Sequence, residues 1–255
     1  MISRKLDVDP EREEQELRAY LGGDFDLDKL RGYQQTLERE YEEIGDEQVL
    51  YRTSTAYLYN LTAFAMTRTK VPYLRELVRH VPPGARVLDY GCGIGSDGLL
   101  LSEAGYDVEF ADFANPSVQY LRWRLDRRGI DARIHDLDEE VPGGFDAAFA
   151  FDVIEHVDDP FAFLQEMENR ADLVTVNFLE PDPADQDLHH ELPVRSLVDR
   201  AAAMDLRSYG VHHGGSHLVL YAPLPSPGRK RLAQMLSVRV HRRLNGMRGF
   251  KGGPH

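Results

Sequence analysis

Apolar and polar positions follow two different periods along the chain. In the first third of the chain, apolar residues recur at helical spacing, which predicts helices over residues 27–44, 49–66 and 71–84. Residues 1–20 are dense in charge, and we expect them to be mobile or to form a solvated helix. The pattern therefore predicts an N-terminal helical segment over residues 1–83, which we expect to act as a lid.

From residue 86 onward, short apolar runs alternate with helical stretches. The expected strands are residues 86–90, 107–112, 131–135, 145–151 and 173–178, then two more within 206–213 and 216–223. The expected helices are residues 96–105, 115–129, 159–170 and 193–204. Such alternation indicates a parallel sheet covered on both faces, and the last two strands should pair antiparallel at one edge. We predict an α/β fold with a doubly wound, seven-stranded, Rossmann-like sheet over residues 84–223.

The remaining residues, 224–255, form a basic tail with eight Lys and Arg and no acidic residue. Helical spacing places several apolar side chains on one stripe among the arginines: Leu232, Met235, Leu236, Val240 and Leu244. Such an amphipathic helix can lie on an anionic membrane or dock a partner. It can also pack against the acidic N-terminal region, which is the alternative that we favour over membrane contact.

Composition narrows the function classes. The net charge of −13 argues against a general nucleic-acid binder, and we expect no DNA partner. The single cysteine, Cys92, excludes an internal disulfide and a cysteine-only metal cluster. The N-terminus shows no apolar signal region, and no apolar run has the length of a membrane span. We expect a cytoplasmic location.

The stretch RVLDYGCGIGSDG, residues 86–98, raises the question of which nucleotide its glycines hold. Residues 93–98 spell the dinucleotide fingerprint G-x-G-x-x-G, which favours a nicotinamide cofactor. However, Asp89 lies at the strand tip, where a carboxylate is a poor neighbour for a pyrophosphate but suits a cofactor that carries an ammonium group. The glycines also begin early, at Gly91. Both features favour S-adenosylmethionine.

Two further carboxylates follow the next strands. Asp112 ends the second strand and can accept hydrogen bonds from ribose hydroxyls in either cofactor, so it does not discriminate between them. Asp136 follows the third strand and could accept a hydrogen bond from an adenine amino group. In open α/β sheets, ligands bind at the carboxyl ends of the strands, where these residues lie.

With its glycine loop, the segment VEFADF and the segment FDAAFAFDVIEHVDDP, the chain resembles class I S-adenosylmethionine-dependent methyltransferases over about residues 84–222. The resemblance implies that Asp89 and residues 91–95 hold the methionine part, Asp112 the ribose and Asp136 the adenine. Residues 145–157 would line the reacting end. The implied cofactor-binding residues are Asp89, Gly91, Cys92, Gly93, Gly95, Asp112, Phe113, Asp136, Leu137 and Phe151.

The reacting end leaves alternatives open. His156 or His190 could serve as a general base, and Glu155 is a further catalytic candidate. A sharper hypothesis is a Mg²⁺ site formed by Asp152, Glu155, His156 and His190. Its pattern resembles metal-dependent ubiquinone-pathway O-methyltransferases and RNA 2′-O-methyltransferases, although those carry Glu where this chain has Asp152. Alternatively, Glu155 and His156 simply begin the helix after the fourth strand.

The leading hypothesis is therefore a methyltransferase that uses S-adenosylmethionine and methylates oxygen or nitrogen of a small molecule, such as a secondary metabolite or a phenol- or quinone-like compound. The alternatives are a metal-dependent RNA 2′-O-methyltransferase, a nicotinamide-dependent oxidoreductase, and a non-catalytic protein that kept the fold. The substrate and the oligomeric state are not apparent from one sequence.

Overall fold

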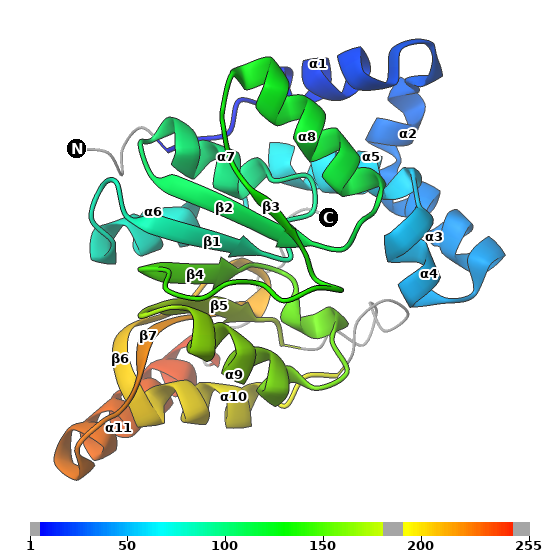
Figure 1. Ribbon diagram of the computed structural model, residues 1–255. Coiled ribbons are helices and arrows are strands. Elements are labelled where there is room, and N and C mark those ends of the chain that lie inside the picture. The colour runs from blue at the N-terminus through cyan, green and yellow to red at the C-terminus, as the bar shows by residue number, and fades with distance from the viewer. Residues whose placement is uncertain (1–5, 181–190, 247–255) are drawn as a thin grey trace. The chain divides into compact units, whose positions relative to one another are not determined.

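The computed structural model describes residues 6–180 and 191–246. The chain divides into two compact units, Met1–Val141 and Pro142–His255 (Figure 1). No helix in the described ranges combines the length and the apolar character that a membrane crossing needs.

The first unit places its helices before and between three parallel strands. Its elements are α1 Pro10–Leu21, η2 Gly22–Asp24, α2 Leu27–Arg31, α3 Tyr33–Ile44, α4 Glu47–Thr53, α5 Ala56–Met66, α6 Val71–His80, β1 Arg86–Tyr90, α7 Ser96–Glu103, β2 Asp107–Asp112, α8 Pro116–Arg128 and β3 Ile134–Asp136. The strand order is β3-β2-β1, with β2 in the centre. In this register Asp112 lies beside Asp136 at the carboxyl ends of β2 and β3.

The N-terminal helices are shorter than the sequence pattern predicts. The expected helix over residues 27–44 breaks at Gly32, which separates α2 from α3. The helix expected over residues 49–66 breaks at Ser54, which is extended; its hydroxyl bonds the Glu40 carboxylate and accepts a hydrogen bond from the Tyr57 N–H. Apolar periodicity continues through both breaks because the helices on each side of a break bury apolar residues, such as Leu30 and Leu37 on either side of Gly32.

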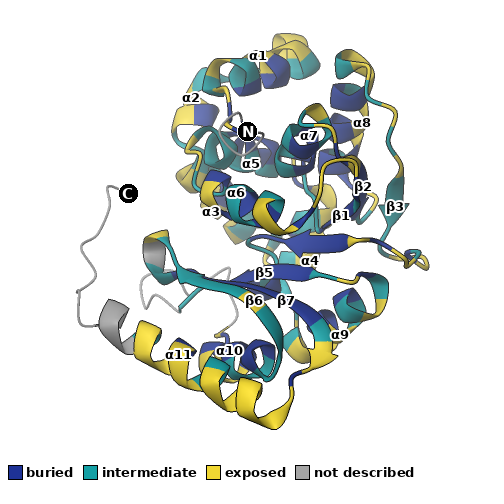
Figure 2. Cartoon of the chain, turned by 90° about the vertical axis from the view of Figure 1, so that its left-hand side faces the viewer, coloured by how far each residue is buried: buried dark blue, intermediate teal, exposed yellow. Residues whose placement is uncertain are grey.

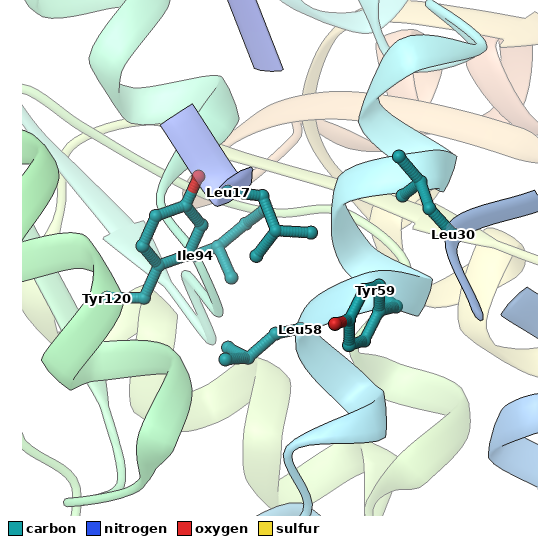
Figure 3. Packing of buried hydrophobic residues seen from close by; sticks show 6 residues of the cluster. All are labelled: Leu17, Leu30, Leu58, Tyr59, Ile94 and Tyr120. Atoms are coloured by element: carbon teal, nitrogen blue, oxygen red, sulfur yellow. The ribbon is translucent and has the colours of Figure 1, made fainter. Parts of the chain in front are cut away.

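The expectation of a solvated or mobile segment over residues 1–20 is wrong for its helical part. In α1, Glu13, Glu16 and Leu17 are buried. Leu17 joins a cluster of apolar residues from four helices and from the glycine loop (Figure 3): Leu17, Leu30, Leu58, Tyr59, Ile94 and Tyr120. The N-terminal helices therefore share a core with the loop, because Ile94 lies between two of its glycines.

The second unit contains four strands. Its elements are β4 Ala147–Ala150, η3 Ile154–His156, α9 Pro160–Arg170, β5 Val174–Phe178, α10 Val194–Ala203, β6 Met204–Val211, η4 His213–Gly215, β7 His217–Pro225 and α11 Gly228–Gly246. β4 and β5 are parallel, and β7 lies antiparallel between β5 and β6. The final antiparallel pair is thus confirmed, and every residue of β5 is buried, as Figure 2 shows.

Local signals fix the helix starts. The Asn115 side chain accepts from the Val118 N–H, with Pro116 as the first residue of α8. The Asp159 side chain caps α9 in the same way, again before a proline. Helices and strands alternate as predicted from β1 to α10, which confirms the α/β fold class with mainly parallel strands.

The basic tail forms the predicted helix, α11. It packs on α10 and β6 of its own unit, and its cations pair with Asp205, Asp199 and Glu180. The acidic partners that the structure shows for the tail thus belong to the second unit, not to the N-terminal region that the charge pattern suggested.

Candidate functional site

The glycine loop between β1 and α7 adopts a conformation that side chains resist. Gly91, Gly93 and Gly95 have φ values of 73°, 53° and 71°. The N–H groups of Gly91 and Cys92 both donate to the carbonyl of Ala111 in β2, at 2.8 and 3.1 Å. The loop is therefore held against the end of the neighbouring strand in a left-handed conformation that glycine adopts without steric strain.

Close packing adds a second requirement for glycine. A Cβ on Gly95 would lie 2.4 Å from Leu121 Cδ1 of α8, and one on Gly93 would lie 2.9 Å from Leu61 Cδ1 of α5. At Gly98, a Cβ would meet the Phe110 ring at 2.3 Å. The third glycine of the fingerprint thus permits close contact between α7 and β2, a role that does not depend on which nucleotide binds.

Asp89 lies at the end of β1, beneath the loop. Its side chain is buried, and Oδ2 accepts a hydrogen bond of 3.0 Å from the Gly98 N–H, at the start of α7. Burial and the nearby charge of Asp97 raise its pKa well above the ordinary value, while Lys70 and the Gly98 N–H oppose that rise. A cation near Asp89 would therefore favour its ionised form.

Asp112, at the end of β2, bonds the loop directly. Its Oδ2 accepts from the Gly93 N–H at 2.7 Å, and its Oδ1 accepts from the Phe113 N–H at 2.7 Å and from the Asn115 amide at 3.3 Å. Burial raises the pKa of Asp112 to about 6, although the N–H groups of Gly93 and Phe113 oppose the rise. The carboxylate can still accept ligand hydroxyls, because each oxygen has more than one acceptor site.

A cavity of about 360 Å³ opens beside Asp112 and Asp136. Further polar groups in its wall are the α8 cap Asn115, Gln119 and Arg122 of α8, and His135, Glu139 and Glu140. This volume lies in the range typical of small-molecule sites. Asp136 is partly buried and accepts a hydrogen bond of 3.0 Å from the Asp138 N–H, and the Leu137 N–H donates to the Asp112 carbonyl at 3.1 Å.

Arg52 covers the residue that follows Asp112. From α4, its guanidinium lies 4.2 Å from the centroid of the Phe113 ring and forms two hydrogen bonds to Asp138, of 2.6 and 2.9 Å. The N-terminal helices thus reach over the ends of β2 and β3. The sequence analysis missed Arg52 because its partners, Phe113 and Asp138, lie more than sixty residues away along the chain and nothing local indicates the contact.

Cys92 is partly exposed, and burial of its sulfur raises the thiol pKa well above the ordinary value. A thiol in this state is a poor nucleophile. The loop cysteine therefore acts as a small packing residue.

A buried ion cluster supports the loop from the side of α8. The Arg124 side chain is 0% exposed and donates to the Ile94 carbonyl and to Ser96 Oγ, at 2.9 and 2.8 Å. The same guanidinium bonds Glu13 at 2.5 Å and Glu16 at 2.9 Å, both in α1. One arginine therefore joins the N-terminal helix to the glycine loop.

The cluster is completed by Arg128, which bonds Glu16 at 2.7 Å. Burial opposes ionisation of Glu16, but the hydrogen bond from Arg128 and the charges of Arg124 and Arg128 outweigh it, so the pKa of Glu16 falls below its ordinary value. Sequence signals existed for this cluster: Arg124 and Arg128 follow the buried Tyr120 at four-residue spacing, and Glu13 and Glu16 share one face of α1.

The predicted reacting-end residues lie in the second unit. Phe151 is buried, with its ring centroid 5.0 Å from that of Phe149. Asp152 has a φ of 55° and is fixed by Asn177, which accepts from the Asp152 N–H at 2.9 Å and donates to Asp152 Oδ1 at 2.7 Å. A positive φ at a residue with a side chain is uncommon and is often found at functional sites.

Glu155 and His156 occupy the short helical turn η3, which is separate from α9, so they do not begin the helix after β4. Glu155 is buried and His156 is partly exposed. His190 lies outside the described residues. Among those described, no group of three or more His, Cys, Asp or Glu side chains could hold a metal ion. The proposed Mg²⁺ site therefore has no support from this geometry, and we derive no step through a metal.

A histidine that the sequence analysis missed lies near this end of the second unit. His217 is buried; its Nδ1 accepts from the Tyr209 hydroxyl at 2.7 Å and its Nε2–H donates to Glu180 at 3.0 Å. Burial lowers the pKa of His217, which Glu180 opposes, and burial raises the pKa of Tyr209 to about 12. Next to His217, Ser216 accepts a hydrogen bond of 3.0 Å from Asn177, the partner of Asp152.

Comparison with known proteins gives the family. The profile of a methyltransferase domain family matches residues 64–207, more than half of the chain. The chain belongs to this methyltransferase family. The match begins within α5 and ends within β6, so α1 to α4 and α11 lie outside it.

Curated relatives match a shorter stretch. A ubiquinone biosynthesis O-methyltransferase of Xanthomonas campestris pv. campestris (strain B100) is 35% identical over 88 residues, which cover 32% of this chain and 37% of the relative. The enzyme of the same name from Xylella fastidiosa (strain 9a5c) is 37% identical over 97 residues, which cover 36% of this chain and 39% of the relative. The matched stretch thus spans well under half of each relative's length.

Among solved structures, the magnesium protoporphyrin IX methyltransferase of Synechocystis PCC 6803 with bound SAH has a TM-score of 0.56 at 16% identity. The match covers 74% of this chain and 99% of that one. The likeness supports the predicted Rossmann-like fold.

Replacement of Gly95 tests the tight packing of the loop. We expect Gly95→Ala to lower the free energy of unfolding by about 1–2 kcal/mol through the left-handed backbone and by a further ~1–3 kcal/mol through the clash with Leu121. Gly129→Ala is the matched control, because Gly129 has a φ of 64° with nothing within 4 Å of an added Cβ. Urea unfolding measures both; equal losses would show that the clash is absent.

Replacement of Arg124 tests the ion cluster. Arg124→Met leaves two buried carboxylates short of a partner, and we expect the free energy of unfolding to fall by about 3–5 kcal/mol. Arg127 lies three residues further along α8 and is exposed. Arg127→Met should change the free energy of unfolding by less than about 1 kcal/mol. The measurement is chemical unfolding followed by circular dichroism. A loss from Arg124→Met as small as that of the control would contradict the assigned role.

Proposed function

We propose that the chain is an S-adenosylmethionine-dependent methyltransferase that methylates an oxygen atom of a small-molecule substrate. The observation that carries the proposal is the glycine loop with a carboxylate at the end of each of β1, β2 and β3, in a chain that belongs to a methyltransferase family. The names of the curated relatives favour oxygen over nitrogen as the acceptor atom. Family membership also argues against the nicotinamide-dependent alternative.

The residues of the first unit fit this cofactor. Gly91, Gly93 and Gly95 give the loop a left-handed backbone that can approach a ligand closely, and Asp89 at the end of β1 favours the ammonium of a methionine moiety. Asp112 accepts the two ribose hydroxyls, and Asp136 with the Leu137 backbone meets the adenine. The Phe113 ring, which packs against the Arg52 guanidinium, adds an apolar surface next to the ribose. The cavity beside Asp112 and Asp136 has room for a nucleoside.

When bound, S-adenosylmethionine supplies a methyl group on a positively charged sulfur. The protein's contribution to such a transfer is chiefly alignment of the acceptor with the methyl group. We assign the alignment of the acceptor to the reacting-end residues. Phe151 supplies an apolar wall, and Asp152 is held in place by its hydrogen bonds with Asn177. A phenol or hydroxyl acceptor must lose a proton, and His156, Glu155 and His190 are the proposed groups that take it.

The further expectations from the sequence are kept as part of this proposal: a small molecule as the partner, no DNA, and a cytoplasmic location. The metal-dependent RNA 2′-O-methyltransferase alternative needs a cation site, and the described residues offer none. The acidic net charge also opposes contact with a phosphate backbone.

Titration of S-adenosylhomocysteine by calorimetry tests the cofactor site. Asp112→Asn replaces one charged acceptor with an amide nitrogen, and a hydrogen bond to a charged group contributes about 1.5–3 kcal/mol, so we expect the Kd to rise by roughly 10- to 150-fold. Asp126→Asn, a conservative change at an exposed position of α8, should leave the Kd unchanged. Thermal melts check that both variants fold. If the wild-type chain gives no heat and no thermal stabilisation, the proposed function is wrong.

The raised pKa of Asp112 predicts a pH dependence. The ligand's hydroxyls favour the ionised carboxylate, so affinity is high above the pKa of about 6 and is lost as the pH falls through it. Between pH 7 and pH 5, we expect the Kd for S-adenosylhomocysteine to rise roughly tenfold, because the ionised fraction falls by that factor. Asp112→Asn should flatten this profile. An equally steep profile in the variant would assign the dependence to another group.

A further inference from the structure

The surface of α11 presents an apolar row to solvent. Leu232, Leu236 and Val240 are 61%, 53% and 56% exposed. Residues four apart on a helix lie on one side with a small drift, so these three form a continuous stripe. Figure 2 shows α11 exposed along most of its length. Contiguous exposed apolar surface marks an interaction site more often than scattered apolar residues do.

The helix is held to its unit by its other side. Val238 is buried, and Gln234 Nε2 donates to the Leu206 carbonyl of β6 at 3.1 Å. Ion pairs join Lys230 to Asp205 at 2.5 Å and Arg242 to Glu180 at 2.7 Å. These contacts fix the rotation of α11 about its own axis, so the apolar row is directed outward by the fold. The side chain of Leu244, which the sequence pattern adds to the stripe, lies outside the described residues.

The charges of the tail itself have one sign, although Asp205, Asp199 and Glu180 of the same unit pair with three of them. Residues 224–255 carry eight Lys and Arg, and all 43 Asp and Glu residues of the chain lie elsewhere. Arg229 and Arg231 are exposed in the first turn, directly before Leu232. A helix that combines exposed Leu and Val side chains with cations is suited to the boundary between lipid headgroups and acyl chains.

We propose that α11 docks the protein on an anionic lipid bilayer, with Leu232, Leu236 and Val240 inserted among the acyl chains and the flanking cations against the headgroups. Charge complementarity argues for this occupant over a second copy of the chain. A symmetric dimer through this face would place two copies of α11 against each other, and the described residues of this helix carry cations and no acidic side chain. The remainder of the chain is strongly acidic and would be repelled by the same bilayer, so contact is confined to the tail.

The N-terminal acidic region is a weaker partner for this row than its composition suggests. Two of its acids, Glu13 and Glu16, are buried and paired with Arg124 and Arg128. Moreover, an apolar row needs an apolar partner, whereas most leucines of residues 6–50 are buried, among them Leu17 and Leu30 of the cluster described above. α11 also lies outside the residues that the family profile matches, so the proposal concerns a feature added to the methyltransferase domain.

Flotation of the full chain with phosphatidylcholine vesicles, with and without phosphatidylglycerol, tests the proposal. We expect binding only with phosphatidylglycerol, weakened by high salt because exposed charges are screened. The triple variant Leu232→Ser, Leu236→Ser, Val240→Ser should lower the ratio of bound to free protein at least tenfold. Arg229→Glu with Arg231→Glu should lower it as well, and more at low salt than at high salt.

The control is Val49→Ser with Phe161→Ser, which removes exposed apolar side chains on α4 and α9 and should leave vesicle binding unchanged. Circular dichroism and thermal melts show whether each variant folds. Absence of binding to phosphatidylglycerol vesicles, or equal binding by the triple variant and wild type, overturns the proposal. The proposal is also overturned if sedimentation shows a concentration-dependent dimer that the triple variant abolishes, while neither the wild type nor the triple variant binds vesicles. None of these results depends on the cofactor titration, so the two proposals fail separately.

Discussion

The buried guanidinium of Arg124 is the constraint on which the rest of the first unit depends. A fully buried arginine remains charged, so it must be surrounded by acceptors, and here two come from α1 and two from the glycine loop and the start of α7. Helices that are distant in sequence are thereby fixed to one another. Because Ile94 also lies in the apolar cluster with Leu17, the loop is held by polar and apolar contacts at once.

This arrangement gives the N-terminal helices a part in the proposed cofactor site, although most of these helices lie outside the residues that the family profile matches. α1 reaches the loop through Glu13 and α4 reaches Phe113 through Arg52, while Leu61 of α5 limits the space at Gly93. The two carboxylates next to the loop, Asp89 and Asp112, resist ionisation because burial raises their pKa values. A ligand with hydroxyl and ammonium groups relieves that opposition, which couples binding to the charge state of the site.

Much of this architecture could be predicted from sequence because its signals are local. Asn115 and Asp159 before prolines mark helix starts, β1 and β2 have the predicted bounds, and the glycine loop follows a buried strand. The breaks at Gly32 and Ser54 were missed because apolar periodicity continues across them. Helical spacing indicates the charged faces that form the Arg124 cluster, but not that they meet, because their proximity depends on tertiary packing. The Tyr209–His217–Glu180 chain depends on tertiary packing in the same way. For the same reason, attention to His156 and His190 overlooked His217.

For α11, the sequence predicts the helix correctly but does not tell which side of it faces the protein. The stripe of Leu232, Leu236 and Val240 predicts an amphipathic helix, and the usual inference is that the apolar side faces the protein. In the structure the polar side faces the protein, because Gln234 and Lys230 bond to β6 and Arg242 bonds to Glu180, which follows β5; Val238 is buried on this side. From sequence alone, the stripe could face either the protein or the solvent. The contacts of Gln234 and Lys230 decide between them, because both side chains lie on the side of α11 away from the apolar row.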